Sequence, residues 1–322
     1  MTISNHSHNT TILLTALLAI AWGFSNESLG QRVVPGTGKP LTEVGDNFED
    51  PDWGYDLKLP KVYNHKEDTL STNSPGGQSK NGRWYEGSKR GQPDFIHRVS
   101  TPLGGLPGST GALAISSIKT GSSQPSYQQQ QDDFIANVAP RVGKLSASRS
   151  PSVVTRVWMP PVDEWENRTG CHFAFRVAVE TDYKVPRKTF FNRNSEETSD
   201  MWPGMFLHFD SKEGKGATRK ENDSAHFWFK ASTNGMQIRG PQVTSTGWWT
   251  LGISMTPDGK VHYYAKPGIE DLTEADHVAS AYPFGRRSLR MRNFFFNACS
   301  GDDGKTESTE FIVDDPTVFV LR

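Results

Sequence analysis

The sequence predicts an all-β protein, a two-sheet antiparallel β-sandwich with long loops and at most short helices. After about residue 150, eight segments of 6 to 11 residues alternate apolar and polar positions, and Gly, Pro, Asn or Asp bounds each of them. Only residues 269–280 (IEDLTEADHVAS) carry a helical pattern, with acidic residues early in the segment. Many strands with almost no helix are typical of a sandwich of the jelly-roll, concanavalin A-like kind.

The expected strands follow one another closely along the second half of the chain. They are residues 152–159, 171–180, 204–210, 225–231, 248–255, 260–265, 290–298 and 310–320. In the second of these, Phe173 and Val179 share one face while Arg176 and Glu180 share the other, as a half-buried strand requires. The Asp258-Gly259 pair predicts a hairpin, because Asp-Gly supplies the positive-φ positions of a tight turn.

The N-terminus predicts an export signal. An apolar run of 13 residues, 12–24, precedes the triplet Ser28-Leu29-Gly30, which suits cleavage before Gln31. The run is shorter than the roughly 20 residues that span a bilayer, and no later segment is apolar enough to do so. The region before it lacks Lys and Arg, so an uncleaved anchor stays as the alternative.

We therefore expect three parts: a secretory signal peptide at 1–30, an extended lead-in at 31–43, and a single β-sandwich domain at 44–322. Turn-forming residues dominate from 44 to about 150, so long loops decorate few strands there. The expected location is secreted, or the cell envelope or periplasm.

Charge and cysteine content limit the partners. The chain has 35 Lys and Arg against 36 Asp and Glu, a net charge of −1, which argues against nucleic acid as a partner. Cys171 and Cys299 are the only cysteines, and an even count in an exported chain allows one disulfide between adjacent strands. Two separate buried thiols are the alternative, and both stay open.

Three segments resemble known carbohydrate-active proteins. Residues 200–207 (DMWPGMFL) resemble the Trp-Pro strand of family-16 glycoside hydrolases, which belong to the concanavalin A-like lectin/glucanase superfamily. Residues 247–264 resemble the later aromatic hairpin of those enzymes, and residues 311–315 resemble closing strands of carbohydrate-binding jelly rolls. The resemblance covers about a quarter of the chain and implies a sandwich whose concave face holds a sugar chain.

The catalytic Glu-x-Asp-x-Glu strand of those hydrolases is absent. Retaining glycosidases need two carboxyl groups about 5–5.5 Å apart, but the strand that should carry them, residues 224–230 (SAHFWFK), has none. Glu180 and Asp182 form the nearest similar pattern, with Lys184 in the final position, and we interpret it as a chance match. Non-catalytic polysaccharide binding is therefore favoured, with glycoside hydrolysis as an alternative.

Outward-facing positions of the expected strands supply candidate ligand contacts. Flat aromatic rings cover the apolar face of a sugar while charged and polar groups bond its hydroxyls, and Arg and Lys favour carboxylated or sulfated chains. The substrate-binding candidates are Arg176, His208, Asp210, His226, Trp228, Lys230, Arg239, Tyr264 and Lys266. The alternative is a face that is polar only because water covers it.

A polysaccharide lyase acting on uronate-containing glycans is a second hypothesis, and a structural cell-envelope protein is a third. Jelly-roll lyases abstract a proton with Tyr or His while Arg, Gln or Asn neutralises the carboxylate. The weak catalytic candidates are His208, His226 and Tyr264. Tyr264 and Lys266 are faintly similar to the Tyr-x-Lys-x-Gly strand of alginate lyases, although Pro267 departs from that pattern.

No cofactor is required by these readings, but a structural calcium ion is one expectation. Glu49 near the start and Asp314 and Asp315 near the end resemble the paired terminal strands that hold calcium in carbohydrate-binding jelly rolls. Solvated turn acids are the alternative. The sequence also lacks a His-Glu-x-x-His zinc motif and a Gly-x-Ser-x-Gly nucleophile elbow.

Overall fold

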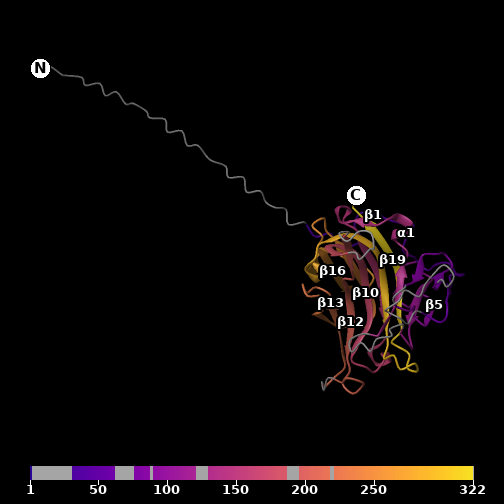
Figure 1. Cartoon of the computed structure of the whole chain (residues 1–322). Coiled ribbons are helices and arrows are strands. Elements are labelled where there is room, and N and C mark those ends of the chain that lie inside the picture. The colour runs from indigo at the N-terminus through magenta and orange to yellow at the C-terminus, as the bar shows by residue number, and fades with distance from the viewer. Residues whose placement is uncertain are drawn as a thin grey trace. The chain divides into compact units, whose positions relative to one another are not determined.

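The computed structural model describes residues 31–61, 76–87, 90–120, 130–186, 196–217 and 221–321, together with Met1. The chain divides into residues up to Gln31 and a compact unit from Arg32 to Arg322, and everything below concerns that unit. Two antiparallel sheets form it, so the predicted β-sandwich is confirmed (Figure 1). The expected signal peptide lies outside the described residues, apart from Met1. No helix among the described residues is long and apolar enough to cross a bilayer.

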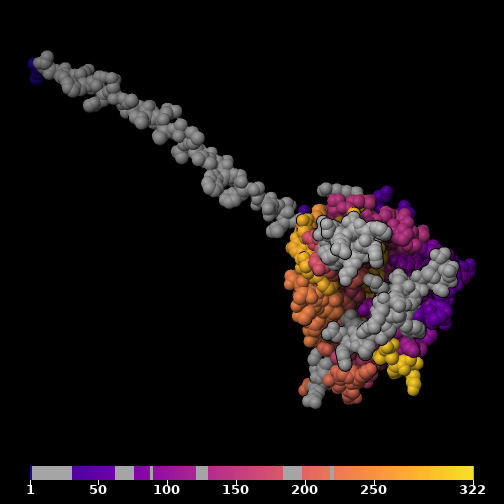
Figure 2. All heavy atoms as spheres, viewed as in Figure 1, coloured from indigo at the N-terminus to yellow at the C-terminus, as the bar shows by residue number. Residues whose placement is uncertain are grey.

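We name the two sheets I and II. Sheet I has the order β17 (His277–Ala281), β16 (Val261–Pro267), β15 (Gly247–Met255), β9 (Ser152–Met159), β19 (Phe311–Val320), β6 (Ala112–Ser116) and β5 (Phe95–Val99), and β1 (Lys39–Pro40) pairs with β19. Its early strand β5 forms one edge, and its late strand β16 lies next to β17, which forms the opposite edge. The surfaces around β5 and β16, indigo and orange, lie on opposite sides of the body in Figure 2.

Sheet II carries the longest strands. Its order is β14 (Ile238–Val243), β13 (Ser224–Phe229), β12 (Gly204–Asp210), β10 (Gly170–Pro186), β18 (Ser288–Cys299), β7 (Gln131–Ala136), β4 (Trp84–Glu86), β3 (Gln78–Ser79) and β2 (Tyr55–Asp56). In addition, β11 (Glu196–Met201) pairs with β10, and β8 (Leu145–Ser146) pairs with β18.

Helices in the described residues are short. They are α1 (Ala139–Val142) and the 3₁₀ turns η1 (Ala147–Arg149), η2 (Val162–Glu164), η3 (Glu274–Asp276) and η4 (Pro283–Gly285). The helix predicted over 269–280 is wrong. Thr273 and Asp276 close a single capped turn, and the residues from His277 onward extend and pair with β16, so strand pairing overrides the local helical preference.

Strand predictions after residue 150 agree closely with the structure. The predicted 152–159 coincides with β9, and the predicted hairpin is β15 and β16, which pair with Met255 opposite Val261. Gly259 in its turn has φ +84°, and a Cβ there would lie 2.7 Å from the Ser288 backbone oxygen. Only glycine therefore suits this turn, both for its conformation and for the close approach of β18.

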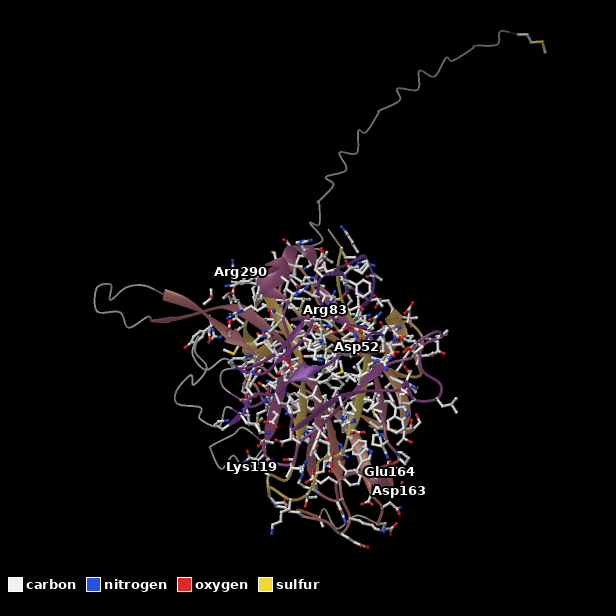
Figure 3. All side chains as sticks on the ribbon, turned by 90° about the vertical axis from the view of Figure 1, so that its right-hand side faces the viewer. Asp52, Arg83, Lys119, Asp163, Glu164 and Arg290 are labelled. Carbon is white, nitrogen blue, oxygen red and sulfur yellow. The ribbon has the colours of Figure 1, made fainter. Side chains whose placement is uncertain are left out.

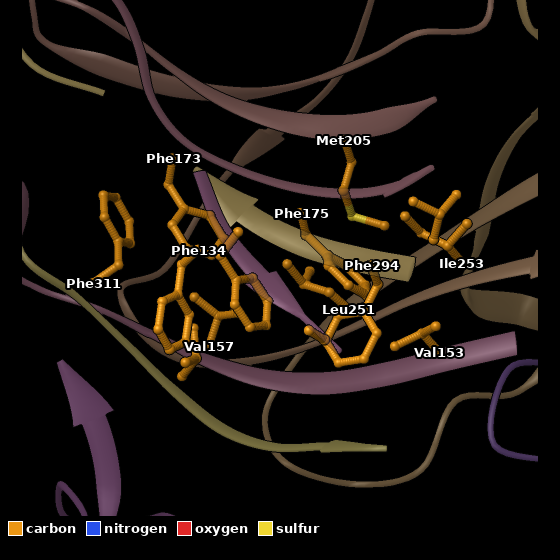
Figure 4. Close-up of a cluster of buried hydrophobic side chains, with 14 of the residues drawn as sticks. Phe134, Val153, Val157, Phe173, Phe175, Met205, Leu251, Ile253, Phe294 and Phe311 are labelled. Atoms are coloured by element: carbon orange, nitrogen blue, oxygen red, sulfur yellow. The ribbon is translucent and has the colours of Figure 1, made fainter. Parts of the chain in front are cut away.

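The core lies between the sheets and explains the alternation in the sequence. Val153, Val157, Leu251, Ile253 and Phe311 come from sheet I, and Phe134, Phe173, Phe175, Phe294 and Met205 come from sheet II (Figure 4). Phe175, Phe294 and Phe296 are fully buried, and their ring centroids lie 5.5 to 6.3 Å apart. Arg290 lies toward one end of the sandwich, and Asp163 and Glu164 lie toward the other end (Figure 3).

Candidate ligand-binding face

The outer face of sheet II is built from rows of side chains that run across its strands. Side chains alternate along each strand, so residues opposite one another in register share a face. The central row consists of Asp133, Asn297, Ala174, Phe206, Trp228 and Arg239, from β7, β18, β10, β12, β13 and β14. Six adjacent strands at about 4.8 Å spacing make this row about 24 Å long.

Two further rows flank the central one. On one side lie Gln131, Cys299, Cys171, His208, His226 and Gln242. On the other side lie Ile135, Phe295, Arg176 and Gly204, with Lys230 joined to Gly204 through its backbone amide. We call these three rows the platform.

The platform gathers most of the predicted contacts. Arg176, His208, Asp210, His226, Trp228, Lys230 and Arg239 all belong to the outer face of sheet II or to the end of one of its strands. The structure therefore brings seven of the nine predicted contacts together on one sheet.

Tyr264 and Lys266 do not join this set. Both lie on β16 in sheet I, and Tyr264 is fully buried on the outer side of that sheet in a cluster with Val154 and Leu272. The expectation that Tyr264 shares a face with Trp228 is therefore wrong, because the hairpin of β15 and β16 pairs with β9 rather than with the strands of sheet II. The similarity to the alginate lyase strand loses its location for the same reason.

Arg176 lies on β10, in one flanking row of the platform, and is only 8% exposed. Its Nη2 donates to the Trp202 carbonyl at 2.9 Å, and its Nη1 lies 3.5 Å from Asn297 Oδ1. The guanidinium carbon lies 5.3 Å from the ring centroid of Phe206 and 5.1 Å from that of Phe295. Its buried Nε has no hydrogen-bond partner, and no ion pair joins Arg176 to a carboxylate among the described residues.

Gly204 makes room for this arginine. A Cβ at Gly204 would lie 2.3 Å from Arg176 Cγ and 2.8 Å from the Phe175 backbone oxygen. The side chain of Arg176 therefore crosses the adjacent strand at the one position where no side chain blocks it.

Other cations surround Arg176. Lys230 Nζ donates to the Gly235 carbonyl at 3.2 Å and lies 5.1 Å from the centroid of the Phe284 ring. Burial, then the charges of Arg176 and Arg90, lower the pKa of Lys230 to about 8. Burial also lowers the pKa of Arg176 to about 10, although the charge of Asp133 opposes that shift. The positive charges of Arg176, Lys230 and Arg90 therefore repel one another where burial leaves little water to screen them.

Asp133 is the acidic group that acts on Arg176, and it is engaged in the central row. Its Oδ1 accepts from Asn297 Nδ2 at 2.6 Å and from Gln131 Nε2 at 3.0 Å. Asn297 thus joins Asp133 to Arg176, which orients its amide and fixes its Oδ1 toward the guanidinium.

Aromatic rings form the other half of the platform. The rings of His208 and Trp228 lie 5.1 Å apart between centroids, with an angle of 34° between their planes. His208 Nε2 is buried without a hydrogen-bond partner. At the rim, Asp210 lies 3.2 Å from Arg239 and 3.8 Å from His226.

Cys171 and Cys299 lie next to each other on β10 and β18 as free thiols, with 3.6 Å between their sulfur atoms. They are thus neighbours, as a disulfide would require, but not bonded in the structure. Burial raises the pKa of Cys171, but the hydrogen bond from Cys299 and the influence of His208 outweigh it, so its pKa falls to about 5.

The predicted calcium ligands lie near one another without forming a recognisable site. Glu49 accepts hydrogen bonds from the Thr110 amide at 3.0 Å and the Thr110 hydroxyl at 2.6 Å, and Asp314 accepts one from Ser109 at 2.9 Å. The described part of the chain contains no group of three or more His, Cys, Asp or Glu side chains arranged to hold a metal ion. Calcium binding therefore stays a prediction.

Several platform residues were missed by sequence reasoning. Phe295, Asn297, Phe206 and Asp133 belong to the platform but not to the predicted contacts. The signal for two of them was present, since alternation along residues 290–298 places Phe295 and Asn297 on the face opposite Phe294 and Phe296.

No protein-family model and no curated protein matches the sequence. Similar solved structures include a conserved carbohydrate esterase from a Shiga toxin-encoding bacteriophage, at 9% identity over 76% of this chain and 92% of that chain, with a TM-score of 0.41. An alginate lyase from Corynebacterium is 9% identical over 84% of this chain and 94% of that chain, with a TM-score of 0.40. The receptor-binding domain of botulinum neurotoxin D is 10% identical over 78% of this chain and 47% of that chain, with a TM-score of 0.32.

Similarity at this level concerns the fold alone and says nothing about a ligand or a reaction. The resemblance to family-16 glycoside hydrolases is accordingly supported only in its coarser form, a two-sheet β-sandwich.

Proposed function

We propose that the protein is an exported polysaccharide-binding protein whose platform holds an anionic chain without cleaving it. The observation that carries the proposal is Arg176, a buried guanidinium with an unpartnered Nε and no ion pair to a described carboxylate. Burying an unpaired charge costs several kcal/mol, and a bound carboxylate or sulfate would offset that cost with charge-assisted hydrogen bonds.

The surroundings of Arg176 fit a polymer better than a small anion. Trp228 and His208 offer flat rings on the same face of sheet II as Arg176, and rings of this kind cover the apolar faces of sugars. The platform is about 24 Å long at the usual strand spacing, so it can contact several sugar units at once. Lys230 adds a second cation at the same end.

A polysaccharide lyase is the second candidate function. The unpartnered, buried Nε2 of His208 favours it, because an imidazole nitrogen without a hydrogen-bond partner, beside a bound uronate, could accept its proton. Of the other two proposed catalytic residues, His226 lies opposite His208 on the platform, whereas Tyr264 lies on sheet I, away from it.

The test is retention of the purified protein on neutral, uronate-containing and sulfated polysaccharides, with product size and the ultraviolet absorbance of unsaturated sugars followed together. Retention by an anionic polymer without smaller products supports the proposal. Smaller unsaturated products would establish the lyase instead, and retention by neutral polymers alone would contradict an anionic ligand.

Two tryptophans give a matched pair of variants for this test. Trp228→Ala removes the platform ring, whereas Trp158→Ala removes a similarly half-buried ring on the outer side of sheet I. We expect retention to weaken only for Trp228→Ala, by about 10-fold or more, given about 1–3 kcal/mol for a stacked aromatic contact. Equal weakening of both variants would place the ligand elsewhere.

A further inference from the structure

A second group of reactive side chains lies on sheet I, outside the platform. Ser280 Oγ on β17 lies 2.7 Å from His262 Nδ1 on β16, and His262 Nε2 lies 3.0 Å from Thr256 Oγ1. Thr256 Oγ1 in turn lies 2.5 Å from Asp258 Oδ1 in the hairpin turn. Ser280 is exposed, whereas His262 is only 2% exposed.

The direction of each hydrogen bond follows from the carboxylate. Burial raises the pKa of Asp258, but hydrogen bonds from Thr256 and Tyr282 outweigh it and keep its pKa below the ordinary value, so Asp258 is ionised and only accepts. Thr256 therefore donates to Asp258, and its oxygen accepts from His262 Nε2. His262 Nδ1 is left with its lone pair toward Ser280, whose hydroxyl donates to it.

This order of groups is that of an activated nucleophile. A base lies within hydrogen-bond distance of a hydroxyl, and a third group fixes the base in the tautomer that accepts the proton. The arrangement here differs in two respects, because Nδ1 rather than Nε2 faces the serine and Thr256 stands between imidazole and carboxylate.

The surroundings keep His262 in its neutral form. Burial, then the charge of His277, lower its pKa to about 4. His277 Nε2 lies 2.6 Å from Ser280 Oγ on the other side of the hydroxyl. Since the Ser280 proton points toward His262, His277 is placed to donate to Ser280 and to an oxyanion that develops beside it.

We propose that Ser280 is the nucleophile of an acyl-transfer site that hydrolyses carboxylic esters, with His262 as its general base. Ser280 Oγ bonds to the ester carbonyl carbon while His262 Nδ1 takes the hydroxyl proton. The ester C–O bond then breaks, and the departing alcohol oxygen receives that proton. Water, deprotonated by His262, cleaves the acyl-Ser280 bond, which releases the carboxylic acid and restores the serine. Thr256 and Asp258 are positioning residues.

The test uses the full protein, a fluorophosphonate probe and p-nitrophenyl acetate. We expect one probe adduct, located on Ser280 by peptide mass spectrometry, and ester hydrolysis that Ser280→Ala abolishes. His262→Gln should lower kcat/KM at least 100-fold, the lower end of general-base effects. Ser245→Ala, which changes an exposed serine outside the cluster, should leave both readouts unchanged.

Variants of Thr256 test the catalytic arrangement separately from folding. Thr256→Val breaks the relay to Asp258, so kcat should fall about 10-fold or more with KM unchanged, and Thr256→Ser should restore it. A folded wild-type protein without an adduct on Ser280, or hydrolysis that survives in Ser280→Ala, would overturn the proposal. Equal rates for Thr256→Val and wild type would overturn the positioning role.

Discussion

Two cations on the outer face of sheet I and two on the outer face of sheet II differ in their partners. On sheet I, Arg156 pairs with Asp271 at 2.8 Å, and Lys266 lies 3.8 Å from Asp276. On sheet II, Arg176 and Lys230 donate to the Trp202 and Gly235 carbonyls, and no carboxylate among the described residues forms an ion pair with them.

This difference separates cations that are paired within the chain from cations without an anionic partner among the described residues. Both faces arise from the same alternation of apolar and polar residues, so pattern alone does not distinguish them. Pairing does, because a cation with a carboxylate beside it is satisfied within the chain, whereas a buried cation without one gains most from an anion supplied by a ligand.

The largest expected effect is on the pH dependence of stability, and it comes from a buried acid on sheet I. Asp314 is fully buried on β19, and burial, then the charge of Asp315, raise its pKa to about 7. The folded protein therefore holds a proton that the unfolded chain releases near pH 4, so stability is greatest in acid and falls as pH rises toward 7. The expected slope is about 1.4 kcal/mol per pH unit between pH 5 and 7.

Asp314→Asn should remove that slope and stabilise the protein at pH 8, since the amide oxygen can accept from the Asp315 backbone amide and the NH2 group can donate to the Ser109 hydroxyl oxygen. Urea unfolding at several pH values measures both effects. A variant that is less stable than wild type at pH 8 would show that the ionised carboxylate has a partner.

Gly204→Ala should produce the next largest effect, and it should lower both stability and binding. The added methyl group would lie within 2.8 Å of the Phe175 backbone oxygen and would displace Arg176. We expect a loss of about 1–3 kcal/mol in the free energy of unfolding, with weaker retention on anionic polymer. Unchanged binding despite the lost stability would show that the position of Arg176 does not matter to the ligand.

Two arginine variants, one on each sheet, compare the contributions of an unpaired and a paired cation to stability without ligand. Arg176→Met keeps the apolar length between Phe206 and Phe295 but removes an unpaired charge, so stability should be unchanged or greater. Arg156→Met breaks an ion pair with the exposed Asp271 and should lower stability by about 0.2–1 kcal/mol. Chemical denaturation decides, and a large loss for Arg176→Met would mark the guanidinium as structural.

The smallest effect concerns pH and Lys230. Because its pKa lies at about 8, Lys230 carries its charge below pH 8 and loses it above. Affinity for an anionic polymer should therefore fall a few-fold from pH 7 to pH 9. Lys230→Met should bind more weakly at pH 7 and lose that dependence, whereas an unchanged pH profile would exclude Lys230 from the site.

Much of the fold was predictable because the later strands are long and half-buried. β9, β10 and β15 show clear alternation, and the Asp-Gly turn identifies the hairpin. The early strands β1, β2 and β3 have two residues each, too few for a period to show, and long-range contacts hold this region, such as those from Arg83 to the Thr42 and Gly45 carbonyls.

The candidate site was predictable only within a sheet. Alternation gives the face of a side chain relative to its own strand, so seven of the predicted contacts meet on sheet II. Which sheet a strand joins depends on distant partners, and Tyr264 and Lys266 were misplaced for that reason. Ser280 escaped notice because its segment carries a helical pattern that pairing with β16 overrides.

The most direct test of the central claim is the affinity of wild-type and Arg176→Met protein for one anionic oligosaccharide from the panel, measured by titration calorimetry at fixed salt. We predict that the variant binds at least 30-fold more weakly, corresponding to about 2 kcal/mol or more for a buried charged contact, while remaining as stable as wild type. Equal affinities with both proteins folded would contradict the claim that Arg176 holds an anionic ligand.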